Sequence, residues 1–367
     1  MKKEELKNLS NFKEDIHRCS KCGICQSACP LFEITGNECT VSRGQFIMLK
    51  GVLNGKLDLN KNINKYLDLC LKCNKCTKFC PSEINALDII LAAKADYFKK
   101  SFWGKIYALL ESKYVFGTML YITEKLCSLF TRKYKSKKFQ KKVVYFGGCI
   151  NKLHPDINNY VKKLLNTMEI EVIDVNFDCC GMLFLTTGNL DRFVEVIKKN
   201  IKNLPEDIDY LLTDCASCNW AWKQYKKYVN DDELCNKIKD IEIKSLYDIL
   251  EEGQLKFKSK KKISVTYHKP CHEESESALN IIKNIENINY KELEGYDECC
   301  GFAGFEHPQT LKTISSIFNK KRANLSKINT NYIITSCVGC LISLKIISFF
   351  KQKVCRLITF LKNNTEV

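Results

Sequence analysis

The stretch from Cys19 to Pro81 holds one cysteine pattern twice. It reads CSKCGICQSACP at residues 19–30 and CLKCNKCTKFCP at residues 70–81. Each copy places two residues between its first three cysteines, three residues before its fourth, and a proline directly after it. This spacing is typical of runs that bind a pair of 4Fe–4S cubane clusters, because it lets consecutive thiolates turn inward onto one small cluster.

The fourth cysteine of each run normally serves the other cluster. We therefore predict one cubane held by Cys19, Cys22, Cys25 and Cys80, and a second held by Cys70, Cys73, Cys76 and Cys29. The competing interpretations are a pair of structural zinc sites and a disulfide framework. Zinc needs only two pairs of ligands, which leaves the third and fourth cysteines of each run without a role.

The number of cysteines and the net charge indicate which classes of protein this chain can belong to. The chain has 22 cysteines in 367 residues and a formal net charge of +16 that counts the cysteines as neutral. Met1–Ser10 is polar and lacks the apolar stretch of a secretory signal, so the cysteines indicate metal binding in a cytoplasmic protein. Thiolates that hold clusters offset much of the positive charge, and no nucleic-acid-binding motif is present, so we expect no nucleic-acid partner.

The N-terminal region is expected to be helical. Apolar residues recur at helical spacing near the N-terminus, from 42 to 49, and from Ala86 to Phe98. Residues 99–142 then form an aromatic and basic connector, which is interpreted as a helix packed between domains that ends in a solvated linker. Its alternative role is peripheral docking on the inner face of an anionic cytoplasmic membrane. No apolar run is long enough to span a bilayer.

The rest of the chain repeats itself. Val143–Cys149 matches Val265–Cys271 at an offset of 122 residues, and Tyr210–Cys218 matches Tyr332–Cys340 at the same offset. So constant an offset indicates two copies of one module. Short β-branched runs alternate with helical patterns in each copy, which predicts a βαβαβ unit with a parallel sheet and its cysteines in the loops after the strands.

Each module supplies five cysteines: one alone, an adjacent pair followed by glycine, and a final Cys-x-x-Cys. Module one offers Cys149, Cys179, Cys180, Cys215 and Cys218. Module two offers Cys271, Cys299, Cys300, Cys337 and Cys340. Five thiolates from three loops fit an iron–sulfur cluster better than a four-ligand zinc site, although zinc remains an alternative in one module. Gly181 and Gly301 suggest a tight backbone that lets each adjacent pair wrap a larger group.

Together these motifs resemble the iron–sulfur subunits of glycolate oxidase and of lactate utilisation. Related families are the anaerobic glycerol-3-phosphate dehydrogenase C subunit and the heterodisulfide reductase subunits. The resemblance rests on both cysteine runs, Arg43-Gly44, Phe146–Cys149, Pro270–His272 and both Cys-Cys-Gly motifs. It implies that the module cysteines bind one or two further clusters, which are noncubane in heterodisulfide reductases.

The resemblance also implies a function. The chain is expected to carry electrons from a flavoprotein (FAD) partner, which oxidises a 2-hydroxy acid such as glycolate or lactate, to a quinone or another acceptor. No residue of the chain is then catalytic. The alternatives are a catalytic subunit that reduces a disulfide at a module cluster, and the iron–sulfur subunit of an anaerobic glycerol-3-phosphate dehydrogenase.

The predicted fold is an α+β multidomain chain. Residues 1–98 form a helical ferredoxin-like domain, and residues 99–142 form the connector. Residues 143–262 and 263–367 form two tandem α/β cysteine-rich modules, which we expect to be related by pseudo-twofold symmetry.

Overall fold

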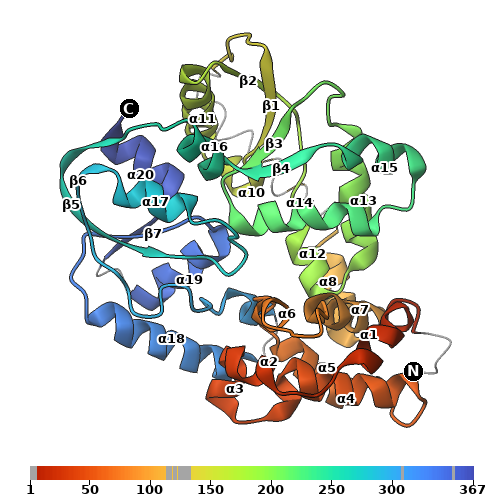
Figure 1. Ribbon diagram of the computed structural model, residues 1–367. Helices are drawn as coiled ribbons and strands as arrows, with labels where there is room; N and C mark the ends of the chain where they lie inside the picture. Colours follow the sequence, from red (N-terminus) through yellow and green to blue (C-terminus); the bar gives the residue numbers. More distant parts are fainter. Residues whose placement is uncertain (1–5, 113–117, 119–121, 123–133, 307–309, 349–351) are drawn as a thin grey trace. The chain divides into compact units, whose positions relative to one another are not determined.

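The computed structural model describes residues 6–112, 118, 122, 134–306, 310–348 and 352–367 (Figure 1). The chain divides into two compact units. The first comprises Met1–Glu111, Leu183–Leu190 and Glu298–Ala323. The second comprises Ser112–Met182, Asp191–Asp297 and Asn324–Val367. The predicted domain boundaries at residues 98, 142 and 262 remain predictions.

The N-terminal part of the first unit is built from helices, as predicted. Its elements in chain order are η2 Leu9–Phe12, α1 Lys13–Arg18, α2 Ile24–Ala28, α3 Pro30–Thr35, η3 Glu38–Thr40, α4 Ser42–Leu53, α5 Lys61–Leu69, α6 Lys75–Lys78, α7 Ala86–Phe98 and α8 Phe102–Leu110. Buried side chains of α4, α5 and α7 form its core, among them Leu49, Leu67 and Ile89. The short helices α2 and α6 each begin inside one cysteine run, between its second and fourth cysteines.

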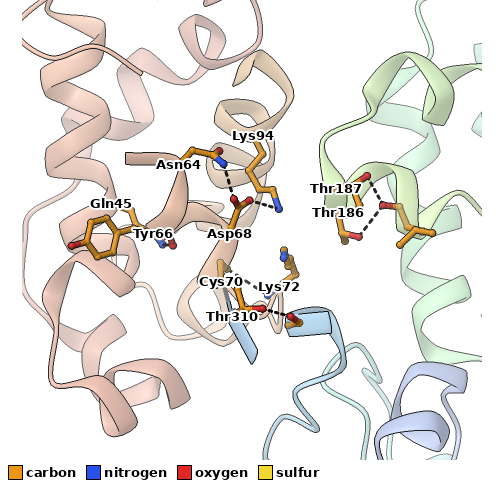
Figure 2. Close-up of polar contacts among 12 residues, drawn as sticks. Gln45, Asn64, Tyr66, Asp68, Cys70, Lys72, Lys94, Thr186, Thr187 and Thr310 are labelled. Atoms are coloured by element: carbon orange, nitrogen blue, oxygen red, sulfur yellow. Dashed lines mark hydrogen bonds and ion pairs between the residues drawn. The ribbon is translucent and has the colours of Figure 1, made fainter. Parts of the chain in front are cut away.

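Buried polar contacts fasten α5 to its neighbours (Figure 2). The ammonium group of Lys94 on α7 lies 3.2 Å from the carboxylate of Asp68 on α5, and both side chains are at most 4% exposed. Asn64 donates to the same carboxylate at 2.6 Å. Gln45 on α4 donates to the backbone carbonyl of Tyr66 at 3.0 Å. These contacts fix the end of α5, which leads directly into Cys70.

The second unit contains two sheets. The strands of the first are β1 Lys141–Phe146, β2 Ile170–Ile173, β3 Tyr210–Thr213 and β4 Glu242–Ser245, in the order β2-β1-β3-β4. The strands of the second are β5 Lys258–His268, β6 Glu286–Tyr290, β7 Tyr332–Thr335 and β8 Lys353–Arg356, in the order β6-β5-β7-β8. Every pair along these two orders is parallel, and β9 Thr365–Glu366 adds an antiparallel pairing with β5.

The two sheets share one topology. Val143 of β1 pairs with Tyr210 of β3, and Val265 of β5 pairs with Tyr332 of β7, so the register repeats at the offset of the cysteines. The sequence predicts only three strands in each module. The fourth strands, β4 and β8, are short and carry few apolar residues, so their alternation is too weak to stand out. The pseudo-twofold relation between the modules remains a prediction.

Helices connect the strands of the second unit and fill the space around them. They are α10 Gly148–Asn151, α11 Pro155–Thr167, α13 Leu190–Lys202, α14 Ala216–Tyr228, α15 Asp232–Lys239, α16 Leu246–Glu252, α17 Ser277–Lys283, α19 Val338–Ser348 and α20 Leu357–Asn364. The remaining elements are α12 Met182–Thr187, η5 Phe302–Glu306 and α18 Leu311–Ser326. One apolar core joins Val143 and Leu212 of the first sheet to Val265 and Ile334 of the second. Helices α11 and α16 contact α20 and α17, respectively.

The membrane-docking alternative concerns residues 99–142. Residues 113–117, 119–121 and 123–133 of this connector lie outside the described part of the chain. Within the described part, none of the helices combines the length and the apolar character needed to cross a bilayer.

Candidate metal centres

The first cysteine run brings its three leading thiols together. Burial raises the pKa of the Cys25 thiol, and the nearby thiols of Cys19 and Cys22 raise it further. Cys22 is exposed, and a backbone hydrogen bond from Ile24 is the main cause of its lowered pKa. The first site therefore has one edge open to solvent.

The second run meets the last cysteine of the first. Burial raises the pKa of Cys76 to about 12, and the thiols of Cys70 and Cys29 contribute to the rise. Burial also raises the pKa of Cys29, with Cys70 as a further contributor. Cys29 thus lies near a thiol of each run, Cys70 and Cys25, and its assignment to the second cubane remains a prediction. Cys80 borders the helical core, and its assignment to the first site remains a prediction.

The two runs share a backbone conformation. The third residue of each run, Lys21 and Lys72, has a positive φ of 59° and 53°. The fifth, Gly23 and Asn74, has a positive φ of 88° and 61°. Such left-handed residues turn backbone N–H groups toward the inside of the loop, and the N–H of Lys72 donates to the Cys70 sulfur at 3.4 Å. Both loops are therefore shaped to surround an anionic cluster.

The five cysteines of the first module form one connected group within the second unit. Cys149 is hydrogen-bonded to Cys179, Cys179 to Cys180, Cys180 to Cys218, and Cys218 to Cys215. Cys179 and Cys180 lie in the loop after β2, and Cys215 lies between β3 and α14, as the sequence predicts. Cys149 and Cys218 lie instead in the first turns of α10 and α14, which follow β1 and β3. Hydrogen bonds from Cys179 and Cys218 lower the pKa of Cys180, whereas the pKa of Cys218 is raised by its thiol neighbours.

Two glycines let the backbone of the first module approach its thiol group closely. Gly181 has a φ of 78°, and a Cβ there would lie 2.6 Å from the ring of Phe193. Gly148 has a φ of 72°, and a Cβ there would lie 3.3 Å from the Cys218 sulfur. A side chain at either position would be strained, so both glycines let the backbone follow the thiol group closely.

The second module's cysteines fall in both units. Cys299 and Cys300 belong to the first unit, and Cys271, Cys337 and Cys340 belong to the second. The Gly301 N–H donates to the Cys299 sulfur at 3.4 Å, and Gly301 has the same φ of 78° as Gly181. These five cysteines as one ligand set remain a prediction.

A contact joins the two modules within the second unit. The thiol of Cys337 is hydrogen-bonded to that of Cys215, its equivalent in the first module. The Cys337 sulfur also lies 3.1 Å from the hydroxyl of Ser217. In the same place the Ala216 N–H donates to the carbonyl of Ser336 at 3.0 Å. The loops after β3 and β7 therefore meet at equivalent residues.

Sequence reasoning missed two buried polar networks beside these loops. In the first module, Asn151 donates to Tyr145 at 2.9 Å and to Asp214 at 3.4 Å. In the second module, Tyr267 and Ser336 donate to Glu273 at 2.6 and 2.5 Å. The three residues of one network lie 122 positions from those of the other. The repeat offset therefore carries a signal for these polar positions as well as for the cysteines.

The residues fit iron–sulfur clusters. The cysteines in the described part of the chain are thiols and form no disulfides, and soft thiolate sets of this kind select iron–sulfur clusters, zinc or copper(I). Backbone N–H groups already point at sulfur in two of the loops. When bound, the clusters would supply one-electron chemistry, and the protein would tune it through burial and hydrogen bonds to sulfur.

Comparison with protein families decides the type of protein. Residues 15–84 match the model of the 4Fe-4S dicluster domain. Residues 143–223 and 265–345 each match the model of the cysteine-rich domain. The chain is an iron–sulfur protein with one dicluster domain and two cysteine-rich domains. The predicted iron–sulfur cofactors are thereby confirmed, while zinc in one module remains a prediction.

This iron–sulfur protein is similar to three curated relatives over most of its length. The probable glycolate oxidase iron-sulfur subunit of Bacillus subtilis is 25% identical, with 94% of this chain and 93% of the relative covered. One subunit of the fumarate reductase (CoM/CoB) of Methanothermobacter marburgensis is 25% identical, with 90% of this chain and 68% of the relative covered. One subunit of the dihydromethanophenazine:CoB–CoM heterodisulfide reductase of Methanosarcina acetivorans is 22% identical, with 92% and 90% covered.

The family resemblance predicted from the motifs is therefore confirmed. Among solved structures, the iron–sulfur protein resembles a hypothetical protein from Helicobacter pylori with a TM-score of 0.54 and 13% identity. That likeness covers 99% of this chain and 72% of the other, and it concerns the fold alone.

Proposed function

We propose that this iron–sulfur protein is the electron-transfer subunit of a 2-hydroxy-acid dehydrogenase that acts on glycolate or lactate. A flavoprotein (FAD) partner oxidises the acid and passes electrons singly to this chain, which delivers them to a quinone or another acceptor. The complex is cytoplasmic, or peripheral on the inner face of the cytoplasmic membrane. Similarity to a probable glycolate oxidase iron-sulfur subunit over nearly the whole chain supports this function.

One structural observation carries the proposal. Cys299 of the second cysteine-rich domain lies in one apolar cluster with Leu31, Leu71 and Ile317, and Cys29 and Cys73 pack against that cluster. All six residues belong to the first unit. A candidate ligand of a cysteine-rich-domain cluster is thus held beside two candidate ligands of the second cubane. An apolar surrounding excludes water, as suits a route for electrons between the two sites.

The cysteines of the first run provide the entry to this route. Cys22 is exposed, whereas Cys29 and Cys73 are partly buried, and Cys299 is buried. A partner protein could therefore approach the first site at Cys22, whereas the cysteines of the second run are all partly buried. Electrons would enter at the cluster of Cys19, Cys22 and Cys25, cross to that of Cys70, Cys73 and Cys76, and leave toward Cys299.

The test is a purification of the complex from native cells under anaerobic conditions. We expect a flavin-containing protein to co-purify, and glycolate or lactate to reduce the iron–sulfur signals of this chain within the complex. A preparation in which neither acid reduces the clusters, although dithionite does, would refute the function. Cluster content is measured in the same sample, so loss of cofactor is distinguished from a wrong substrate.

A cavity favours a second candidate function, the reduction of a disulfide. It measures about 280 Å³ and is bordered by Cys215 of the first cysteine-rich domain. Asn219 and Lys223 line it together with His272, whose ring stacks on Trp220 at 4.9 Å. The Asn219 side-chain amide is buried and its NH₂ has no hydrogen-bond partner among the described residues. Turnover of a disulfide by the isolated chain with a reduced viologen dye would support this candidate over the first.

A further inference from the structure

The first turn of α4 meets both cysteine runs. The Ser42 hydroxyl is hydrogen-bonded to the thiol of Cys76 in the second run. The backbone N–H of the next residue, Arg43, is hydrogen-bonded to the thiol of Cys25 in the first run. Two consecutive residues of one helix therefore contact different candidate clusters.

The Arg43 guanidinium also faces the first run. Its Nη1 atom lies 3.1 Å from the position that a Cβ of Gly23 would take, between Cys22 and Cys25. The charge of Arg43 also helps to lower the pKa of Cys22, although less than the hydrogen bonds from the Ile24 backbone, the Ser20 side chain and the Cys22 backbone do. The guanidinium therefore lies next to the loop that carries these two cysteines.

Arg43 retains an unused donor there. Its Nε atom is buried and has no hydrogen-bond partner within the described part of the chain. The carboxylate of Glu38 forms an ion pair with Arg43 at 3.9 Å from Nη2, a distance too long for a hydrogen bond. A buried N–H without an acceptor is costly, so this donor points to a partner that the thiols alone do not provide. A sulfur of a bound cluster would satisfy it.

Two glycines make this arrangement possible. A Cβ at Gly44 would lie 2.1 Å from the carbonyl oxygen of Glu38, so only glycine lets α4 begin this close to the preceding turn. Gly23 leaves the space that the guanidinium occupies. The equivalent residue of the second run is Asn74 rather than glycine. The contacts described for Arg43 with the cysteine loops are with the first run.

We propose that Arg43 and Ser42 set the reduction potentials of the two cubanes separately, Arg43 acting on the cluster of the first run and Ser42 on that of the second. Reduction adds a negative charge to a cluster that is already anionic. A cation or a hydrogen-bond donor at its sulfurs stabilises the reduced form and raises the potential. Arg43 contributes both charge and a donor, so its effect exceeds that of Ser42. The inference rests on the proposed cluster content but not on the identity of the substrate.

The experiment compares full-length variants that are purified anaerobically and titrated with dithionite while EPR signals are recorded. Cys22→Ser identifies the signal of the first cluster. Arg43→Met is expected to shift the reduction equilibrium of that cluster about tenfold toward the oxidised form, which is 59 mV for one electron. Ser42→Ala should lower the potential of the other cluster by a smaller amount. Lys56→Met removes an exposed cation outside both cysteine runs and should shift neither potential.

Arg43→Lys is a second, more conservative variant, which tests the proposal even if the Arg43→Met protein loses its cluster. It keeps the positive charge but loses the Nε donor, so we expect a smaller shift in the same direction. Equal shifts of both clusters in an Arg43 variant would overturn the proposal, as would unchanged potentials in Arg43→Lys and Ser42→Ala. Wild-type protein without two four-iron clusters would contradict the proposed function instead, and iron analysis of the same samples distinguishes the two results.

Discussion

Arg356 of β8 donates to Asp214, the residue directly after β3, over 3.0 Å, and both side chains are at most 2% exposed. The same guanidinium also donates to Asn151. The second sheet is thus ion-paired to the first, beside Cys215. Coulomb attraction from Arg356 opposes the effect of burial, which raises the pKa of Asp214.

Replacing Arg356 with Met should leave the Asp214 carboxylate buried and unpaired. We expect a loss of about 3–5 kcal/mol in the free energy of unfolding, measured by denaturant titration of anaerobic protein. The control is Lys362→Met. Lys362 pairs with Asp156 on a partly exposed surface, so its removal should cost less than about 1 kcal/mol. Similar losses in the two variants would show that the buried ion pair stabilises the protein no more than the partly exposed one does.

Gly44→Ala should disrupt the dicluster domain. Its new Cβ would lie 2.1 Å from a backbone oxygen, so the start of α4 must move away from Glu38. We expect reduced iron content and a lower melting temperature. The matched control is Gly36→Ala, where no atom lies within 4 Å and only the positive φ of 59° is strained, at a cost of about 1 kcal/mol. Full iron content in Gly44→Ala would mean that α4 tolerates the shift.

Cys22→Ser should remove or convert one four-iron cluster and leave the other largely intact. The reason is that Cys22 lies with Cys19 and Cys25, while Cys29 is predicted to serve the cluster of the second run. Iron analysis and EPR of the reduced protein give the measurement, with Cys39→Ser as the control outside either run. Loss of both clusters in the Cys22 variant, with none lost in the control, would contradict independent sites.

Cys300→Ser should abolish electron delivery to the acceptor while both cubanes remain reducible. Cys300 is a candidate ligand at the end of the proposed route, one residue beyond Cys299, which packs with the second cubane's cysteines. Stopped-flow reduction of the clusters and steady-state turnover with a quinone analogue are measured on one preparation. Undiminished turnover would exclude this module as the terminal site. Cys355→Ser, outside all motifs, should behave like wild type.

Any binding to anionic vesicles should depend on the basic end of the connector. Lys135, Lys137 and Lys138 belong to a segment with no acidic residue. Changing all three to Glu should weaken co-sedimentation with phosphatidylglycerol vesicles, and added salt should weaken it in wild type. Binding that is unchanged by the substitutions and by salt, or the absence of any binding, would leave the connector with a packing role only.

The cysteine chemistry could be predicted from the sequence because it depends on spacing along the chain. The strands at Val143–Phe146 and Tyr210–Thr213 could be predicted for a similar reason, since they are buried apolar runs. The contacts of Ser42 and Arg43 could not. They depend on where α4 begins relative to the cysteine loops, and that position follows from tertiary packing at Gly44.

The shared core of the two sheets has a consequence for how this chain could be divided. Val143 and Leu212 are buried in the same apolar cluster as Val265 and Ile334. A cut near residue 262 would leave each cysteine-rich domain with an uncovered apolar face, and neither of these two domains would have a complete core of its own. We therefore expect the two cysteine-rich domains to be insoluble when each is produced alone, and to recover a native-like structure only when they are refolded together. The two domains would then fold as one cooperative unit.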